Sequence, residues 1–384
     1  MPWSEVTEMH AKLKFINDYL CNKYTIAHLC RVHNISRKTG YKIINRFNNF
    51  GIGGLSSLSR THQNHPLTTD NETINFILDI KKEYPTWGPN KVKQFLDRDY
   101  SNKKWPAVST IGGIFKKHGL VSSDRKRKRI VKPYTDPLKE CDRPNAVWSA
   151  DFKGQFKLGN KRYCYPLTIT DNFSRYLIIC KSLLSPNLKE TKDGFIKAFQ
   201  KYGLPQAIRT DNGSPFASNA IHGLSSLSIW FIKLGINIER IDLGHPEQNG
   251  RHERMHRTLK AEATKPPGSN LITQQKKFNK FINIYNNIRP HAALEGKSPS
   301  EIYMPSQINY PKKIKEVDYG ADKTVRKVRY NGEIKFANRE YYVGKVLKGE
   351  TVGLKQFEED VWIIYFYHLN IGMINTRKLL IERF

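Results

Sequence analysis

Long apolar runs, a leader-like N-terminus and paired cysteines are all missing from this sequence. No stretch of 18 apolar residues occurs, so no transmembrane helix is expected. The N-terminal residues 1–5 form neither a basic nor an apolar segment, so we expect no signal peptide. The five cysteines are odd in number and include no Cys-x-x-Cys pair. They are typical of reduced thiols in a reducing compartment, and a structural zinc site is not expected.

Acidic residues are also scarce, because 35 Asp and Glu face 64 Lys and Arg, which gives a formal net charge of +29. Such an excess attracts a polyanion, most often nucleic acid. A ribosome-like or membrane-surface protein would share this charge. Here, however, the basic residues alternate with regular apolar periodicity, which indicates folded domains. A chain of 384 residues should hold two to four of them.

Residues 1–60 are predicted to hold three helices in the order of a helix-turn-helix domain. The second helix, near 25–33, has apolar residues at i, i+3 and i+4. Asn34 suits the tight turn, and Ser36 is expected to cap the third helix. An ordinary three-helix bundle with solvated charges remains the alternative. The residues placed to meet base edges at the start of the third helix are Arg37, Lys38, Thr39 and Lys42.

Residues 66–122 repeat this scheme as a second, winged-helix-like domain. Pro89 suits the first turn of one helix, Ser109 is expected to cap another, and Gly119 to end it. The segment 123–140 is a basic linker by composition, of a kind that becomes ordered on phosphates. Its candidate DNA contacts are Arg125, Lys126, Arg127, Lys128 and Arg129.

Residues 141–308 are predicted to form one α/β domain. Three apolar, β-branched strands come first, then helix, strand, helix, strand and helix. The strands are expected at 147–152, 163–170, 176–183, 207–210 and 238–243, and the first two helices at 188–202 and about 217–234.

Residues 312–384 are predicted to be a separate all-β domain. Asn331-Gly332 is a strong hairpin signal between 328–330 and 333–336, and the later strand 361–367 is rich in aromatic and β-branched residues. A small SH3-like barrel is the expected closure.

Two acids interrupt or follow apolar strand-like runs of the α/β domain. Asp151 stands in Trp148-Ser149-Ala150-Asp151-Phe152, and Asp211 precedes the turn Asn212-Gly213. A third, Glu253, lies on a basic helix. Acids so placed in a strongly basic protein suggest Mg²⁺ ligands beside a phosphodiester backbone. For Asp211 an ordinary turn-forming acid is the alternative.

These motifs give the chain a family resemblance. Asp151 in its setting, the run Thr210-Asp211-Asn212-Gly213-Ser214-Pro215-Phe216, and Tyr285-Asn286 followed by Arg289-Pro290-His291 resemble the DDE transposases of bacterial insertion sequences, which share their core with retroviral integrases. The resemblance covers nearly the whole chain. It implies a multidomain α/β protein with N-terminal helix-turn-helix modules, an RNase H-like integrase catalytic core and a C-terminal small β-barrel.

The third acid is ambiguous by spacing. Glu247 leaves 35 residues between itself and Asp211, and Glu253 leaves 41. In the family's local pattern an acid follows a Pro-x-x-x-Gly turn and lies in the next helix. Pro246 and Gly250 match that turn, so we favour Glu253, with Arg257 and Lys260 on the same helix face. The resemblance then makes Asp151, Asp211 and Glu253 the catalytic ligands of two Mg²⁺ ions, which Mn²⁺ could replace.

Two other sequence patterns could indicate metal ligands. His252-Glu253-Arg254-Met255-His256 spells the zinc-protease signature H-E-x-x-H, but the third ligand is missing where known variants place it. Asp171 is expected to cap the hairpin between the second and third strands of the α/β domain and not to bind metal.

The resemblance predicts cleavage of mobile-element ends and joining of their 3′-hydroxyls to target DNA. Expected partners are double-stranded DNA and a second copy of the chain on that DNA, with no membrane, in a bacterial cytoplasm near the nucleoid. A non-catalytic helix-turn-helix regulator and an RNase H-type nuclease are the alternatives. The candidate phosphate contacts of the core are Arg209, Arg251, Arg254, Arg257 and Lys260.

Overall fold

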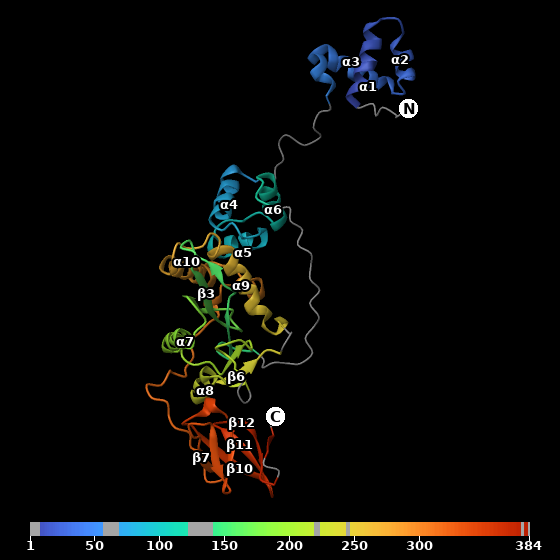
Figure 1. Ribbon diagram of the computed structural model, residues 1–384. Coiled ribbons are helices and arrows are strands. Elements are labelled where there is room, and N and C mark those ends of the chain that lie inside the picture. Colours follow the sequence, from blue (N-terminus) through green and yellow to red (C-terminus); the bar gives the residue numbers. More distant parts are fainter. Residues whose placement is uncertain are drawn as a thin grey trace. The chain divides into compact units, whose positions relative to one another are not determined.

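The computed structural model describes residues 8–56, 69–121, 141–218, 223–242, 246–377 and 380–382. The chain divides into two compact units, Met1–Thr69 and Asp70–Phe384 (Figure 1). The predicted DNA contacts at 125–129 lie outside the described residues. Within the described part, no helix has the length and apolar character needed to cross a membrane.

The first unit has the predicted helix-turn-helix order. Asn34 takes a φ of +51° in the turn, and the Ser36 hydroxyl accepts a hydrogen bond from the Thr39 N–H at 3.1 Å. Gly40 lets the second and third helices approach, because a Cβ there would lie 2.4 Å from the Cys30 sulfur. The elements are α1 (Glu8–Leu20), α2 (Ile26–Val32), α3 (Arg37–Phe50) and the 3-10 helix η1 (Gly51–Leu55).

The second unit begins with three helices around their own apolar cluster: α4 (Asn71–Glu83), α5 (Pro89–Asp99) and α6 (Val108–Lys117). Pro89 stands in the first turn of α5 as predicted. The capping prediction for Ser109 is wrong, because α6 begins at Val108 after an N-cap Ala107 that offers no side-chain bond. Gly119 follows the helix at a φ of +68°, as expected. No strand occurs among the described residues 69–121.

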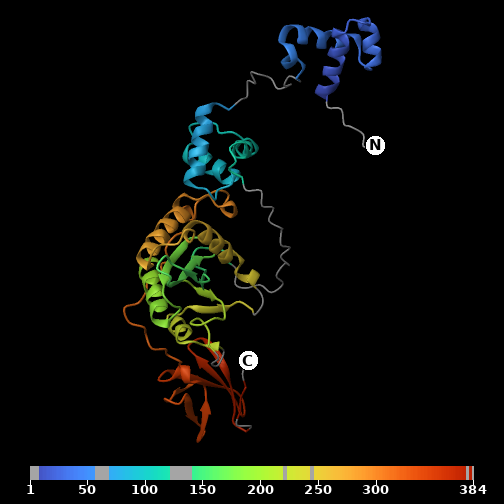
Figure 2. The same cartoon turned by 45° about the horizontal axis from the view of Figure 1, so that its top comes forward.

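The central part is a mixed sheet covered by helices on both faces (Figures 1 and 2). The strand order is β4-β3-β1-β5-β6, with the short β2 also on β3; β1, β5 and β6 run parallel, and β1, β3 and β4 antiparallel. This confirms the RNase H-like order. The strands are β1 (Val147–Phe152), β2 (Phe156–Lys157), β3 (Tyr163–Asp171), β4 (Leu177–Leu183), β5 (Ala207–Thr210) and β6 (Asn237–Arg240).

The helices of this part follow the prediction with one correction. The helix expected from about 217 starts only at Ser226, where the Ser225 hydroxyl caps it by accepting the Ser228 N–H at 3.1 Å. The elements are α7 (Leu188–Tyr202), α8 (Ser226–Lys233), η3 (Pro246–Asn249), α9 (Gly250–Ala263), α10 (Leu271–Asn283), the π-helical turn η4 (Ile284–Ile288), η5 (Ala292–Leu294) and η6 (Pro299–Glu301).

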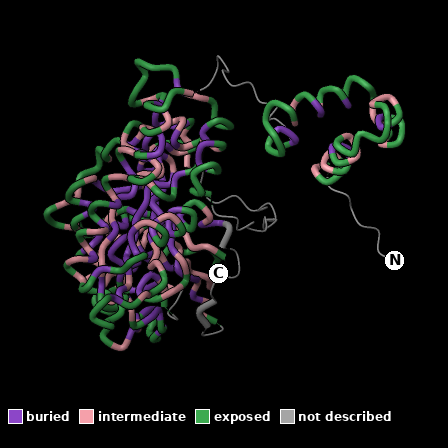
Figure 3. The backbone as a smooth tube through the Cα atoms, turned by 90° about the horizontal axis from the view of Figure 1, so that it is seen from above, coloured by how far each residue is buried: buried purple, intermediate pink, exposed green. Residues whose placement is uncertain are grey.

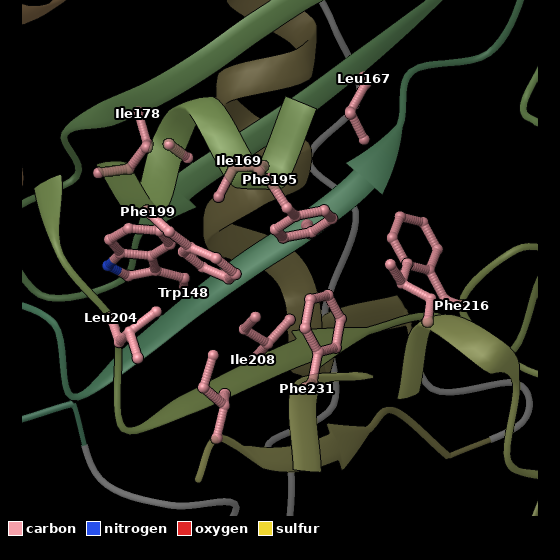
Figure 4. Packing of buried hydrophobic residues seen from close by; sticks show 14 of the residues in the cluster. Trp148, Leu167, Ile169, Ile178, Phe195, Phe199, Leu204, Ile208, Phe216 and Phe231 are labelled. Carbon is pink, nitrogen blue, oxygen red and sulfur yellow. The ribbon is translucent and has the colours of Figure 1, made fainter. Parts of the chain in front are cut away.

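The alternation of side chains along the strands gives the sheet two different faces. On one face Trp148, Ile169 and Ile208 pack with Phe199 of α7 and Phe231 of α8, and this is the main core (Figure 4). On the other face Cys164, Leu177 and Cys180 pack against apolar residues of α9 and α10. Buried positions therefore run through the interior of the unit on both sides of the sheet (Figure 3).

The C-terminal part is an antiparallel sheet in the order β13-β12-β11-β10-β7, with β8 and β9 paired separately. Its apolar cluster includes Ile229 and Ile232 of α8, and Lys233 forms an ion pair with Glu350 at 2.7 Å, so it packs on the core. The strands are β7 (Thr324–Lys327), β8 (Glu333–Phe336), β9 (Arg339–Tyr342), β10 (Thr351–Glu358), β11 (Val361–Phe366), β12 (Leu369–Asn375) and β13 (Leu380–Glu382), with the 3-10 helix η7 (Lys345–Leu347) after β9.

The hairpin prediction for this part is only half right. A turn does form at Asn331-Gly332, where Gly332 has a φ of +89° and the Arg329 N–H donates to the Glu333 carbonyl at 2.8 Å. Residues 328–330 are not a strand, however, and β8 pairs with β9 instead.

Candidate active site

Asp151 and Asp211 are brought together by the register of two parallel strands. In β1 and β5, Ser149 lies opposite Arg209 and Ala150 opposite Thr210, so the next positions are Asp151 and Asp211. The Asp151 side chain points to the face opposite the main core, because Ala150 points into that core. Asp211 lies near it, since repulsion from the Asp211 carboxylate raises the pKa of Asp151. Two acids that are 60 residues apart in the sequence (211 minus 151) thus become neighbours at one sheet edge.

Glu253 reaches this edge from the first turn of α9. The helix buries His252, Met255, His256 and Leu259 against the sheet and leaves Glu253 exposed. Arg257 and Lys260 are exposed too, as predicted for a face that carries one acid and two cations.

The three carboxylates are close enough to influence one another. Burial, then repulsion from the Asp211 carboxylate and more weakly from that of Glu253, raises the pKa of Asp151 to about 7, against the lowering effect of a backbone hydrogen bond and Lys153. Clustered carboxylates repel when no cation is present. A dication bound among them would remove this penalty, and carboxylate oxygens are the ligands that Mg²⁺ prefers.

The Asp211 carboxylate also makes the turn contact that was its alternative interpretation. It accepts the Gly213 N–H at 3.2 Å. A Cβ at position 213 would lie 3.0 Å from one carboxylate oxygen, so glycine keeps this space open. The contact orients the carboxylate and uses one lone pair, which leaves others for a cation.

Sequence reasoning missed a hydrogen-bond network beneath Asp151. The Thr168 hydroxyl donates to the Asp151 carbonyl at 3.0 Å and contacts the Nε2 atoms of His252 and His256 at 2.8 and 2.6 Å. Thr170 contacts His252 Nδ1 at 2.7 Å. The sequence contained a signal for this network. Thr168 and Thr170 are two positions apart and so share one face of β3, and the histidines, at i and i+4, share one face of α9. The network ties α9 to the strand that carries Asp151.

The same contacts involve the two histidines of the zinc-protease signature. Ligand atoms of Asp151, His252 and His256 lie within 4.8 Å of one another, close enough for one ion. Yet both Nε2 atoms and the Nδ1 of His252 are already hydrogen bonded to threonines inside the protein. Burial lowers the pKa of His252 to about 3 and that of His256 to about 2, so both rings are neutral. Three of the four ring nitrogens of this signature thus hold α9 on β3, and the fourth, His256 Nδ1, lies 3.7 Å from Asp151 Oδ2.

Asp171 is a structural cap, as predicted. One of its carboxylate oxygens accepts the Asn145 N–H at 2.7 Å, and the other accepts the Ser174 N–H at 2.8 Å and the Ser174 hydroxyl at 2.6 Å. Burial raises its pKa despite these bonds. Its carboxylate thus joins the turn between β3 and β4 to the segment that precedes β1.

The structure removes Arg209 from the candidate phosphate contacts. Its side chain is only 8% exposed and pairs with Glu239 on the neighbouring strand β6 at 2.9 Å. A guanidinium held in this way is not available to DNA. Arg251, Arg254, Arg257 and Lys260 are exposed along α9, and Arg251 also donates to the Asn172 carbonyl at 3.0 Å.

The stretch from Tyr285 to Pro290 joins three parts of the second unit. The Asn286 side chain accepts the Leu177 N–H at 2.8 Å and donates to the Leu177 carbonyl at 3.0 Å, which fixes η4 to β4. Arg289 pairs with Glu262 of α9. Lys91 of α5 donates to the Pro290 carbonyl at 2.7 Å. This stretch is therefore structural and brings no catalytic group.

The raised pKa of Asp151 predicts a stability effect in the metal-free protein. Since the folded state binds this proton more tightly than the unfolded chain, its stability should fall as pH rises from about 4 to about 7. Asp151→Asn removes this loss. At pH 8 in EDTA the variant should unfold at a higher temperature than the parent, and its free energy of unfolding should be larger by roughly 1–3 kcal/mol. This difference in unfolding free energy between variant and parent should become smaller as the pH is lowered toward 5.

Calorimetry of both proteins across this range checks the prediction. The buried histidines act in the opposite sense, stabilising the fold as pH rises from about 3 to 6.5. They are common to both proteins and cancel in the difference. A variant no more stable than the parent at pH 8 would contradict the assignment.

The described α3 presents all four predicted base-reading residues to solvent. Arg37, Lys38, Thr39 and Lys42 are exposed in its first two turns, and Ile44 faces the unit's apolar core on the other side.

Four family models match the chain in an order that follows its architecture. They are a helix-turn-helix domain over residues 11–60, an integrase core domain over 142–246, a second integrase core model over 234–299, and the C-terminal domain of IS481 family transposases over 323–381.

Similar proteins include the uncharacterized 31.7 kDa protein of insertion element IS407 from Burkholderia multivorans. It is 25% identical over 256 residues, which cover 64% of this chain and 87% of that protein. The Gag-Pol polyprotein of gibbon ape leukemia virus is 30% identical over 32% of this chain, and the match spans only 7% of the polyprotein.

Among solved structures, the HTLV-2 integrase catalytic core domain in complex with magnesium matches 42% of this chain and 98% of that one, with 21% identity and a TM-score of 0.34. The simian T-cell lymphotropic virus intasome in complex with PP2A regulatory subunit B56 gamma matches 80% of this chain and 98% of that one, with 15% identity and a TM-score of 0.38.

Proposed function

Because the chain belongs to the insertion-sequence transposases with an integrase catalytic core, and so acts in DNA transposition, we propose that it cleaves the ends of its mobile element and joins their 3′-hydroxyls to target DNA. The observation that carries this proposal is the convergence of Asp151, Asp211 and Glu253 at one sheet edge. A DNA-binding regulator has no need of such a cluster.

The three acids are the proposed ligands of two Mg²⁺ ions, for which Mn²⁺ could substitute. When bound, such ions activate a water and stabilise the leaving oxyanion of a phosphodiester. The donor set fits, since it consists of carboxylate oxygens whose mutual repulsion a dication relieves. No side chain of this site acts as a covalent nucleophile in the proposal.

Other residues hold the strand and the helix in place for this chemistry. Thr168 bonds to the Asp151 carbonyl and to both buried histidines of α9, so β1 and the helix bearing Glu253 keep a fixed relation. The exposed cations Arg254, Arg257 and Lys260 on α9 are the proposed contacts for DNA phosphates beside the carboxylates.

The first unit is the proposed reader of the element ends. Alanine at Arg37 and Lys38 should weaken binding to end DNA about 10- to 100-fold, because base-edge contacts are lost. Binding to scrambled DNA should change much less. Alanines at 125–129 should instead weaken binding to both DNAs alike and flatten its salt dependence. Competition binding separates the two, and an equal loss on both DNAs for the α3 variant would exclude this helix as the reader.

The finer domain limits remain proposals: 1–60, 66–122, 123–140, 141–308 and 312–384. We also propose that the C-terminal sheet closes into a small barrel, which is supported by the contact of β8 with β7 and of β9 with β13. Paired joining of two ends needs two active sites, so a two-fold dimer or a pair of dimers on DNA is the proposed assembly.

The direct test is incubation of the purified protein with the DNA that flanks its own gene, plus Mg²⁺, followed by mapping of the cut ends. Cuts confined to two related terminal sequences, each leaving a 3′-hydroxyl that joins to a second DNA, are expected. Binding without cleavage would favour the regulator, and cleavage of RNA in hybrids without joining would favour the nuclease.

A further inference from the structure

A small pocket lies beside the proposed metal site but does not include its carboxylates. It is formed by the turn after β3, the first turns of α9 and Tyr285 of η4, and it is a hollow partly open to solvent, with an enclosed space of about 10 Å³, enough for about one water molecule. Met255 and the Tyr285 ring supply apolar wall, and Arg175 and Arg251 supply charge. Arg175 is half-buried and Arg251 is exposed, so both charges can be reached from solvent.

Both guanidinium groups depend on the same protein acceptor. Arg175 Nη1 donates to the Asn172 carbonyl at 2.6 Å, and Arg251 Nη1 donates to it at 3.0 Å. A guanidinium has five N–H donors, so most donors of both groups have no acceptor among the described residues. The Tyr285 hydroxyl, which lines the same pocket, likewise has no hydrogen bond within the described part of the chain.

The charge of the pocket is not balanced from within. Burial, and then the field of Arg251, lowers the pKa of Arg175 to about 10, with a further lowering from Arg254. Asp171 is the nearby carboxylate, but its oxygens are bonded to Asn145 and Ser174. Three cations around one engaged carboxylate favour the binding of an anion. A merely structural Arg175 would need only its bond to Asn172.

The strand register places this pocket relative to the metal site. Thr168 of β3 lies opposite Asp151, and Asp171 lies three positions further along the same strand. Three residues of strand span about 10 Å. The rise of about 3.4 Å per nucleotide is measured along the helix axis, and neighbouring phosphates of one strand lie roughly twice as far apart, so 10 Å corresponds to about one to two nucleotides.

We propose that the pocket of Arg175, Arg251 and Tyr285 binds one phosphodiester of the DNA strand undergoing reaction, about one to two nucleotides from the scissile phosphate. The proposal rests on the proposed function. The guanidinium forks and the tyrosine hydroxyl donate to its phosphate oxygens, and this contact sets where along the strand the carboxylates meet the backbone. It is a positioning contact and takes no part in bond breaking.

The proposal is tested by removing one phosphate charge from the DNA and the Arg175 charge from the protein, separately and together. End DNA is prepared with a single neutral methylphosphonate at each position from one to six nucleotides on either side of the scissile bond. The intact protein should cleave about tenfold more slowly when the methylphosphonate is one or two nucleotides from the scissile bond, a loss the size of one charge-assisted hydrogen bond. In Arg175→Gln the unmodified DNA should already be cut about tenfold more slowly, with no further loss at that position.

Lys161→Gln is the control, since Lys161 is a cation in a turn at a similar positive φ, +64° against +65° for Arg175, but it is exposed, lies before β3 and does not line the pocket. It should keep the parent pattern. If Arg175→Gln melts at lower temperature, Arg175→Lys keeps the charge and should retain the sensitive position. The same scan in the target strand shows whether the bound phosphate belongs to the end or to the target.

The outcomes separate the pocket from the function as a whole. If the parent protein cuts its ends but shows no sensitive position one or two nucleotides from the bond, the pocket does not bind the reacting strand. The same holds if Arg175→Gln keeps the full methylphosphonate effect. If the parent protein does not cut at all, the proposed function fails before the pocket is at issue.

Discussion

Replacing Asp151 or Asp211 with asparagine is expected to reduce cleavage of element ends by about a thousandfold or more. Each substitution keeps the shape of the side chain but removes a carboxylate charge from the edge where β1 and β5 end in register. A bound metal supplies several kcal/mol of transition-state stabilisation, and about 4 kcal/mol corresponds to a thousandfold in rate. Initial rates of end cleavage in Mg²⁺ provide the measurement.

Binding of end DNA should be nearly unchanged in both variants, because the proposed reading residues lie in the other unit. Asp193→Asn is a suitable control, since Asp193 is an exposed acid on α7 and should have no effect on either assay. Cleavage by either asparagine variant at more than a tenth of the parent rate would show that the carboxylate is not a metal ligand.

The core could be predicted because its signals are local. The strands β1 and β5 and the helix α7 have the predicted limits, since each is a short apolar run or amphipathic stretch bounded by Pro, Gly or Asn. The α8 helix started later than expected because Ser225 caps it, and the apolar residues before it do not continue the helix. Periodicity locates an element better than its first residue.

The burial of Arg209 and its ion pair with Glu239 could not be predicted from local sequence signals. Its partner Glu239 lies 30 residues away and comes opposite it only through the parallel register of β5 and β6. An arginine next to a candidate metal ligand has the same local pattern whether it faces DNA or a buried carboxylate. The threonine and histidine network has a similar origin, because the contact of β3 with α9 is a tertiary one.

The prediction for the C-terminal part placed a hairpin at the wrong turn. The Asn331-Gly332 signal predicts a hairpin between 328–330 and 333–336, and a turn does form there. However, β8 forms its hairpin with β9, and the turn between them is Ala337-Asn338. Both residues have positive φ, of +48° and +59°. This conformation matches the two-residue turn of a type I′ hairpin, for which alanine is an uncommon first residue.

The choice between Glu253 and Glu247 gives the most discriminating expectation. Glu253→Gln should reduce end cleavage about a thousandfold, as for the two aspartates. Glu253 lies in the first turn of α9, exposed beside Asp151, and its carboxylate contributes to the raised pKa of that residue. The helix position is fixed by His252 and His256, which bond to Thr168 of the strand next to β1.

Glu247→Gln should change the rate less than about threefold, because residue 247 belongs to the 3-10 helix η3, ahead of the helix that is fixed to the sheet. Both variants replace a glutamate by its amide within seven positions of the chain (247 to 253), so they control for each other in charge and in effects on DNA attraction. Cleavage rates measured side by side, with end binding as the reference, decide the matter. If Glu247→Gln lost cleavage and Glu253→Gln kept it, η3 and not α9 would supply the third ligand, and the helix face of Arg257 and Lys260 would serve DNA binding alone.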